Sequence, residues 1–213
     1  MTDCKPLTTP AAITQAVAPD NELYDNPTQY RRLAVALQYL TIARPDLSYS
    51  SSASTDIHAF SDSDWAGCPV NRKSTSGYVV FLGTNLVSWV SRKQRTVARF
   101  STEAEYKGLA DVSAEVTWVI SLLCELGLHS GRPATLWCDN LGATYLYANP
   151  VFHARTKHVE IDFHFVRDKV ASGEFQVNFV STKDQLADIF TKPLPSSRFG
   201  LLRGKLNVVF IPP

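Results

Sequence analysis

The chain has 213 residues, a length that suits one ordinary domain with some additional sequence. Hydrophobic residues make up 45% of it, enough to build a core, which argues against wholesale disorder. The 21 basic and 20 acidic residues nearly cancel, so any nucleic-acid binding has to use local basic patches. The four cysteines are scattered without a C-x-x-C pair, which disfavours a zinc site and a disulfide scaffold. We expect neither a signal peptide nor a membrane span, because no apolar run is long enough.

The N-terminal segment, residues 1–56, differs in composition from the rest. Pro, Thr, Ala and Asn dominate its start, and an amphipathic helix is predicted over 30–42. A Ser-rich polar stretch over 48–55 is typical of a linker. We therefore expect the main folded unit to begin near residue 57.

Three strand-like runs follow this segment. The first, over 57–65, ends in acidic residues, and the next two, over 75–83 and 86–91, are rich in β-branched and aromatic residues. A turn at Thr84-Asn85 joins the latter two runs. A meander of antiparallel strands is the simplest arrangement for all three.

A long helix is predicted over 102–126, because Leu109, Val112 and Val116 begin an apolar stripe at helical spacing. Thr102 and Glu105 fit a capping box at its start. The remaining patterns predict strands over 134–138 and 175–181 and helices over 140–148, 158–170, 183–191 and 197–206. This order predicts an α/β fold with a five-stranded mixed sheet, its first three strands antiparallel, flanked by helices.

Four acidic residues lie at notable positions of these elements. Asp62 is at the end of the first strand and Asp139 at the end of the fourth, Glu105 is near the start of the long helix, and Asp188 is in a late helix. In an open α/β sheet the ends of neighbouring strands meet at one edge, where ligands bind. Four acids gathered there would need cations, and Mg²⁺ prefers carboxylates and substrate phosphates. Two such ions can activate a water and stabilise the leaving oxygen of a phosphodiester. The simpler alternative is that Asp139, with Asn140, caps the next helix and Asp188 is a solvated helix residue.

Register helps to choose between neighbouring acids. At about 100° per residue, Glu105 falls on the apolar stripe of the long helix and is predicted to face the sheet. Glu103 points away from that stripe and is predicted to face water. Asp62 and Asp64 share one face of their strand, so the pattern alone does not separate them.

Several long motifs carry a resemblance to a known family. SDSDWAG (61–67), SWVSRKQRTVARFSTEAEYKGLA (88–110), LWCDNLGA (136–143) and DQLADIFTKPL (184–194) resemble successive blocks of copia-type retrotransposon ribonuclease H domains. The likeness implies an RNase H-like domain over 57–208, with a tail over 209–213.

The resemblance also implies roles for the four acids, since each matches an acid of the family's motifs. Asp62 would bridge two Mg²⁺ ions, Glu105 and Asp139 would hold one of them, and Asp188 the other, with Mn²⁺ as a substitute. The implied reaction is hydrolysis of the RNA strand of an RNA–DNA hybrid, leaving 3′-hydroxyl and 5′-phosphate ends. A mobile His that precedes the last Asp in cellular relatives is replaced by Ser181-Thr182-Lys183.

A basic cluster just before the long helix is the candidate site for backbone phosphates, each contact adding to a salt-dependent affinity. The alternative is an ordinary solvated loop. The residues predicted to contact the hybrid are Arg92, Lys93, Arg95, Arg99, Ser101 and Asn140.

The segment YRRLAVALQYLTIARPDLSYS (30–50) resembles the region that connects reverse transcriptase to this domain in copia-type polyproteins. The helical stretch expected after it is missing, so residues 1–56 are predicted to be a partly disordered remnant of that region. The implied partner is the reverse transcriptase portion of a Pol polyprotein. The implied location is the cytoplasm, in a virus-like particle of the parent element, or the nucleus. The oligomeric state stays open.

Two other functions compete with ribonuclease H activity. A catalytically idle remnant could still bind nucleic acid or protein, although the four acids are intact. Integrases and transposases share the implied fold family and chemistry but place their Glu last. Here Glu105 comes second among the acids, which excludes them.

Overall fold

The computed structural model describes residues 54–146 and 160–206. The predicted helix over 30–42, the tail over 209–213 and the start of the predicted 158–170 helix lie outside these ranges, and the domain boundaries stay predictions. The strands are β1 (Ile57–Asp64), β2 (Thr75–Leu82), β3 (Asn85–Lys93), β4 (Ala134–Cys138) and β5 (Phe175–Phe179). The helices are α2 (Ser101–Glu125), α3 (Leu141–Leu146), α4 (Glu160–Ala171), α5 (Asp188–Thr191) and α6 (Ser196–Lys205).

All five strands form one mixed sheet with the order β3-β2-β1-β4-β5. The meander is confirmed, since β1 pairs antiparallel with β2 and β2 with β3. The other two strands return through helices, so β1–β4 and β4–β5 are parallel pairs. The predicted α/β class with its antiparallel first three strands is therefore confirmed.

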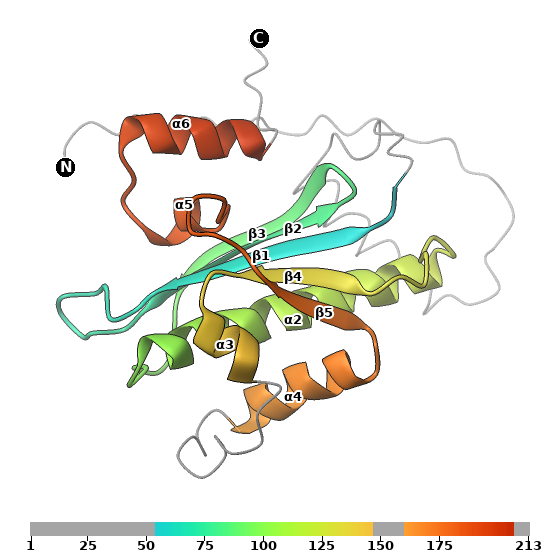
Figure 1. Cartoon of the computed structure of the whole chain (residues 1–213), viewed down its shortest axis with the longest axis horizontal. Coiled ribbons are helices and arrows are strands. Elements are labelled where there is room, and N and C mark those ends of the chain that lie inside the picture. The colour runs from blue at the N-terminus through green and yellow to red at the C-terminus, as the bar shows by residue number, and fades with distance from the viewer. Residues whose placement is uncertain (1–53, 147–159, 207–213) are drawn as a thin grey trace, which may run out of the picture.

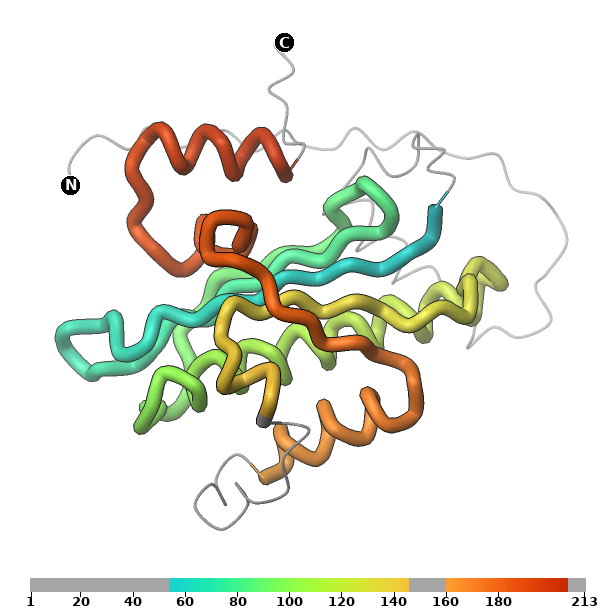
Figure 2. The backbone as a smooth tube through the Cα atoms, in the orientation of Figure 1, coloured from blue at the N-terminus to red at the C-terminus, as the bar shows by residue number. Residues whose placement is uncertain are grey.

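Helices cover both faces of this sheet (Figure 1). The helices α2 and α4 lie on one face, where Tyr106, Leu109 and Val166 belong to the larger hydrophobic core. The helices α5 and α6 lie on the other face over a smaller core that includes Val79 and Leu202. The strands β1 and β4 run in the same direction and end where α2 begins (Figures 1 and 2). That edge of the sheet is where the predicted acids come together.

Two sequence-based expectations at helix starts are wrong. The helix predicted over 183–191 is only the single turn of α5, because the fully buried Gln185 donates its amide Nε2 to the Ser61 carbonyl at 2.9 Å. That contact ties the preceding segment to β1 and stops it from continuing the helix. The predicted capping box is also absent, since Phe100 is the N-cap of α2 and makes no side-chain cap bond.

Glu103 is buried rather than facing water. Its Oε2 accepts the Arg99 backbone N–H at 2.9 Å, and its Oε1 lies 2.6 Å from the Lys107 ammonium. Both partners are local to the first turns of α2, so Glu103 stabilises the start of that helix and is not one of the converging acids.

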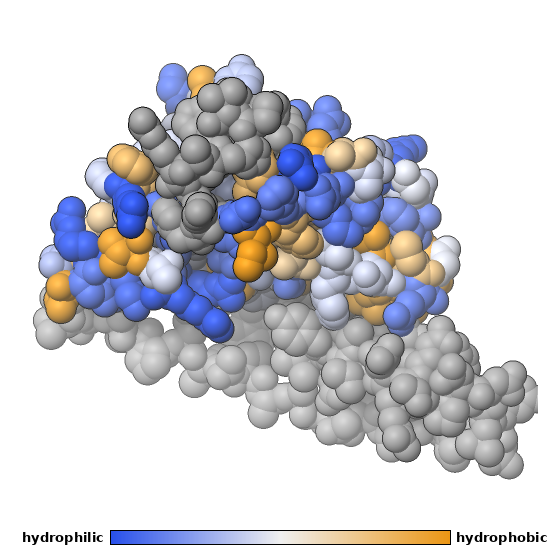
Figure 3. Space-filling model, turned by 90° about the horizontal axis from the view of Figure 1, so that it is seen from below, coloured by the Kyte–Doolittle hydropathy of each residue, from blue (hydrophilic) through white to orange (hydrophobic). Residues whose placement is uncertain are grey.

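None of the helices in residues 54–146 and 160–206 is long and apolar enough to cross a membrane. On the side where α4 lies, the described surface is mostly hydrophilic, with small hydrophobic patches scattered over it (Figure 3).

Candidate metal centre

Parallel pairing of β1 and β4 brings the first two acids together. Ser61 pairs with Cys138 at the end of this ladder. Asp62 is the next residue of β1, and Asp139 directly follows β4. Asp62 is fully buried, whereas Asp139 is partly exposed. Adjacent strand ends therefore place two carboxylates side by side, as expected for an open α/β sheet.

The other two acids reach this point from opposite faces of the sheet. Glu105 comes from the second turn of α2 and is 7% exposed, and Asp188 begins α5 and is 2% exposed. One oxygen each of Asp62, Asp139 and Asp188 lies within 4.8 Å of the others. Glu105 forms a second such group with Asp139 and the Cys138 thiol. The structure thus brings all four predicted acids into one site, with Asp139 common to both groups.

Two glycines allow these helices to approach β1 and β2 closely. A Cβ atom on Gly108 of α2 would lie 2.8 Å from the Ser63 hydroxyl. On the other face, a Cβ on Gly77 of β2 would lie 2.7 Å from Phe190 Cβ and 2.8 Å from Thr191 Cγ2. Any larger residue at Gly77 would move α5, and Asp188 with it, away from the sheet.

Two neighbouring polar side chains, Asp64 and Asn140, form local hydrogen bonds with the backbone and are not among the converging acids. The Asp64 carboxylate accepts the Thr75 backbone N–H across the turn between β1 and β2. Asn140 Oδ1 accepts the Ala143 N–H at 3.0 Å and thereby caps α3. Asp139 does not cap that helix; its Oδ2 accepts a hydrogen bond from the Thr182 hydroxyl at 3.3 Å.

Among the described residues, no cation forms an ion pair with the Glu105 carboxyl group. Burial, together with repulsion from Asp62 and Asp139, raises the pKa of Glu105 to about 9. The Ser63 backbone N–H is a hydrogen-bond donor to this carboxyl group, but Oε2 has no hydrogen-bond partner among the described residues. Burial and the nearby Asp62 also raise the pKa of Asp139. A buried oxygen without a partner is costly, and a cation would satisfy it.

The half around Asp188 already holds two cations. The Lys192 ammonium lies 2.7 Å from Asp188 Oδ1 and 3.0 Å from Asp62 Oδ1, and Arg198 Nη2 lies 2.7 Å from Asp188 Oδ2. The Thr191 hydroxyl donates a short hydrogen bond to Asp62 Oδ2. Hydrogen bonds and charge from Asp188 and Asp62 raise the pKa of Lys192 despite its partial burial.

Sequence reasoning missed these cations. The only available signal was that Lys192 follows Asp188 by four residues, which is the spacing of neighbours on one helical face. The contact between Lys192 and Asp62 joins residues 130 positions apart and has no local signature.

The donor set fits a hard divalent cation. Carboxylate oxygens from four separate elements converge, and the unpartnered Glu105 oxygen points to a missing positive charge. The Cys138 thiol is the one softer donor of the two groups; burial raises its pKa, which keeps it protonated and a poor ligand for Mg²⁺.

The predicted phosphate-binding residues lie beside this site at the end of β3. A hollow of about 480 Å³ is lined by Arg92, Lys93, Gln94, Arg95, Thr96, Lys107, Asp111 and Asp162. Arg92 is paired with Asp111 at 2.5 Å, so part of its charge is already balanced. Arg99 and Ser101 are exposed but do not line the hollow. Three of the four predicted basic residues are therefore gathered in one place.

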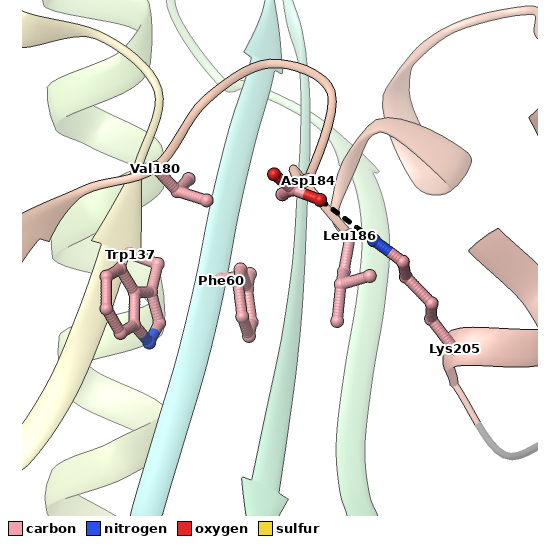
Figure 4. A pocket seen from close by; sticks show the side chains of 6 residues that line it. All are labelled: Phe60, Trp137, Val180, Asp184, Leu186 and Lys205. Atoms are coloured by element: carbon pink, nitrogen blue, oxygen red, sulfur yellow. Dashed lines mark hydrogen bonds and ion pairs between the residues drawn. The ribbon is translucent and has the colours of Figure 1, made fainter.

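A second hollow, of about 430 Å³, lies on the α6 face of the sheet (Figure 4). The rings of Phe60 and Trp137 stack side by side on β1 and β4 at 6.0 Å between centroids. Lys205 pairs with Asp184 at 2.9 Å next to them. The lining is mainly apolar and contains none of the four acids.

Known proteins resemble the chain over its whole length. It is 42% identical to the Retrovirus-related Pol polyprotein from transposon RE1 and 40% identical to that from transposon RE2, both of Arabidopsis thaliana, with 100% of this chain covered each time. It is 33% identical to the corresponding polyprotein from transposon TNT 1-94 of Nicotiana tabacum over 90% of this chain. No family model matches.

The chain spans only 17% of the length of the first two of these relatives. The match to the RE1 polyprotein extends over 255 residues, more than the 213 of the chain, so the aligned region contains positions that this chain lacks.

Solved ribonuclease H structures are also similar to the chain. RNase H1 from Halobacterium salinarum has a TM-score of 0.47 and 13% identity, covering 64% of this chain and 94% of that one. LC11-RNase H1 in complex with an RNA/DNA hybrid has a TM-score of 0.48 and 11% identity over the same shares.

Proposed function

Because the chain belongs to the copia-type, retrovirus-related Pol polyproteins, we propose that it is a metal-dependent ribonuclease H that cuts the RNA strand of RNA–DNA hybrids. The observation that carries the proposal is the convergence of Asp62, Glu105, Asp139 and Asp188 from four elements onto one edge of the sheet. A set of carboxylates with an unpartnered buried oxygen has no evident structural purpose without a cation.

The four acids would hold two Mg²⁺ ions, with Mn²⁺ as a substitute. Bound ions of this kind supply an activated water for in-line attack and stabilise the leaving oxygen, which gives 3′-hydroxyl and 5′-phosphate ends. Asp139 belongs to both groups of potential ligands and would serve both halves of the site. Asp62 belongs to the Asp188 group, and the resemblance to the family implies that it would bridge the two ions.

The basic hollow beside α2 would bind the sugar–phosphate backbone of the hybrid. Lys93 and Arg95 are exposed there, and the hollow adjoins the strand end that leads into α2. Such contacts fix the position of a duplex without reading its sequence. Recognition of RNA would come from the shape of the hybrid and its 2′-hydroxyl groups.

In the parent element the partner would be the reverse transcriptase portion of the Pol polyprotein, which produces such hybrids. The site of action would be a virus-like particle in the cytoplasm, or the nucleus.

The first test is cleavage of an end-labelled RNA–DNA hybrid in Mg²⁺ by the whole chain and by its Asp139→Asn variant. We expect metal-dependent cutting of RNA by the unchanged chain and a loss of at least about a hundredfold in the variant, because Asp139 is a potential ligand in both groups. Absence of cutting by the folded, unchanged chain in both Mg²⁺ and Mn²⁺ would favour an idle remnant that only binds nucleic acid or protein.

A matched pair of variants tests the assignment of Asp62 over its neighbour. Asp62→Asn is expected to lose cleavage to the same extent as Asp139→Asn. Asp64→Asn keeps an oxygen for the Thr75 N–H and is expected to cleave within a few-fold of the unchanged chain. Equal losses in the two variants would contradict the assignment.

A further inference from the structure

Lys192 occupies the centre of one half of the proposed metal site. Its ammonium contacts Asp188 Oδ1 at 2.7 Å and Asp62 Oδ1 at 3.0 Å, so a single cation joins two carboxylates of the proposed metal-binding set. Asp62, Asp139 and Asp188 also form the group whose oxygens lie within 4.8 Å of one another. A divalent ion held by this group would compete with the ammonium for the Asp62 and Asp188 carboxylates.

The two cations of this half differ in how firmly they are held. Arg198 uses the outer oxygen of Asp188, Oδ2, and also donates to the Thr182 carbonyl, so it is fixed to the backbone as well. The described hydrogen bonds of the Lys192 ammonium are to the two carboxylates alone, and its side chain is 35% exposed. A flexible four-carbon stem next to water allows the ammonium to move without disturbing α5.

We propose that Lys192 is a tethered countercation, which neutralises Asp62 and Asp188 in the metal-free protein and has to leave before a divalent ion can bind to them. The exchange makes the protein stable without metal and weakens metal binding to the Asp188 half. This inference rests on the proposed metal centre.

Electrostatics supports a strict exchange rather than joint occupancy. An ammonium and a divalent ion bound to the same Asp62 and Asp188 oxygens would stand within a few ångströms of each other, where like charges repel strongly in a partly buried site. The Glu105 half has no such internal cation among the described residues, so it takes a divalent ion without displacing one.

The test is calorimetric titration of the whole chain with Mn²⁺ in the absence of nucleic acid, comparing the unchanged chain with Lys192→Met and Lys192→Arg. Methionine keeps most of the length of the side chain and removes the charge. We expect Lys192→Met to tighten binding at one site by at least about tenfold, which corresponds to about 1.4 kcal/mol. Lys192→Arg keeps the charge and is expected to stay within about threefold of the unchanged chain.

The matched control is Lys169→Met, which breaks a pair with Glu174 at 2.6 Å at the opposite end of β5. It is expected to leave Mn²⁺ affinity unchanged. Thermal unfolding with a chelator gives a second readout: Lys192→Met should unfold at a lower temperature than the unchanged chain, and saturating Mn²⁺ should close the gap. A purely structural Lys192 would give the loss of stability without the gain in affinity.

Equal or weaker Mn²⁺ binding by Lys192→Met would overturn the inference, as would a variant that does not fold even at saturating Mn²⁺. The failure of the proposed function is distinguishable from both results. In that case the unchanged chain would bind no Mn²⁺ and cut no hybrid, or Asp139→Asn would bind Mn²⁺ as well as the unchanged chain.

Discussion

The two halves of the acidic site differ in how their buried carboxyl groups are stabilised in the absence of metal. Around Asp188, two carboxylates are matched by the cations of Lys192 and Arg198. Around Glu105, no cation contacts the carboxyl group among the described residues, and its pKa rises to about 9, so without metal it holds a proton at neutral pH. The comparison shows two ways in which a cluster of buried acids can be stabilised without metal, by internal ion pairs or by protonation. The two ways respond differently to mutation and to pH.

The largest expected effect on stability comes from removing the ion pairs in the half around Asp188. Asp188→Asn removes the charge that Lys192 and Arg198 both contact in a nearly fully buried position. Loss of one partner from a buried pair is strongly destabilising, and partial exposure of the two cations reduces the cost here to about 3 kcal/mol. Urea unfolding in a chelator measures it.

The control for Asp188→Asn is Asp184→Asn, which breaks an exposed pair with Lys205 and should cost less than about 1 kcal/mol. Equal effects of the two substitutions would show that the Asp188 half is not held by its ion pairs.

The next effect separates the halves by displacing α5 alone. Gly77→Ala places a Cβ within 2.8 Å of Phe190 and Thr191, so α5 has to move off the sheet. We expect a loss of about 2 kcal/mol in the free energy of unfolding. Mn²⁺ titration should then show the Asp62–Asp188 site weakened and the Glu105–Asp139 site retained.

The control for this variant is Gly200→Ala in α6. A Cβ there meets no atom within 4 Å, and alanine favours a helix, so stability should be unchanged or higher. Simultaneous loss of both metal sites in Gly77→Ala would mean that the halves are not independent.

The half around Glu105 should determine how the free energy of unfolding depends on pH. The folded, metal-free protein holds the Glu105 proton more tightly than the unfolded chain, because the pKa rises from 4.5 to about 9. This contribution is complete below pH 4.5 and is lost as the pH rises to 9, with a slope of at most about 1.4 kcal/mol per pH unit.

Glu105→Gln should flatten most of that slope when urea unfolding in a chelator is followed between pH 5 and pH 9. The raised pKa of Asp139 acts in the same direction and leaves a smaller residual slope. Saturating Mg²⁺ should also remove the slope in the unchanged chain, because the ion replaces the proton. An unchanged pH profile in Glu105→Gln would show that another group carries it.

Local patterns predicted most of the fold and three of the four acids, whereas the choice of Asp62 over Asp64 came from the resemblance to the copia-type motif. Strand alternation and turn residues placed β1 to β5 within one or two residues, and helical register correctly turned Glu105 towards the sheet edge. One miss has a local cause and the other a tertiary cause. Glu103 is buried because the Lys107 ammonium and the Arg99 N–H accompany it, and α5 is short because Gln185 binds the backbone of β1.

The smallest expected effect concerns substrate and leaves both halves of the metal site unchanged. Lys93→Gln and Arg95→Gln each remove one exposed charge from the basic hollow. Each should weaken hybrid binding several-fold and reduce the slope of log affinity against log salt by about one. Mn²⁺ affinity should stay constant, since neither residue contacts an acid of the site.

Arg132→Gln, which breaks an exposed pair with Asp56, is the matched control and should alter neither the hybrid affinity nor the salt slope. A salt slope that does not change in Lys93→Gln and Arg95→Gln would place the phosphate contacts elsewhere, with Arg99 as the next predicted residue to replace.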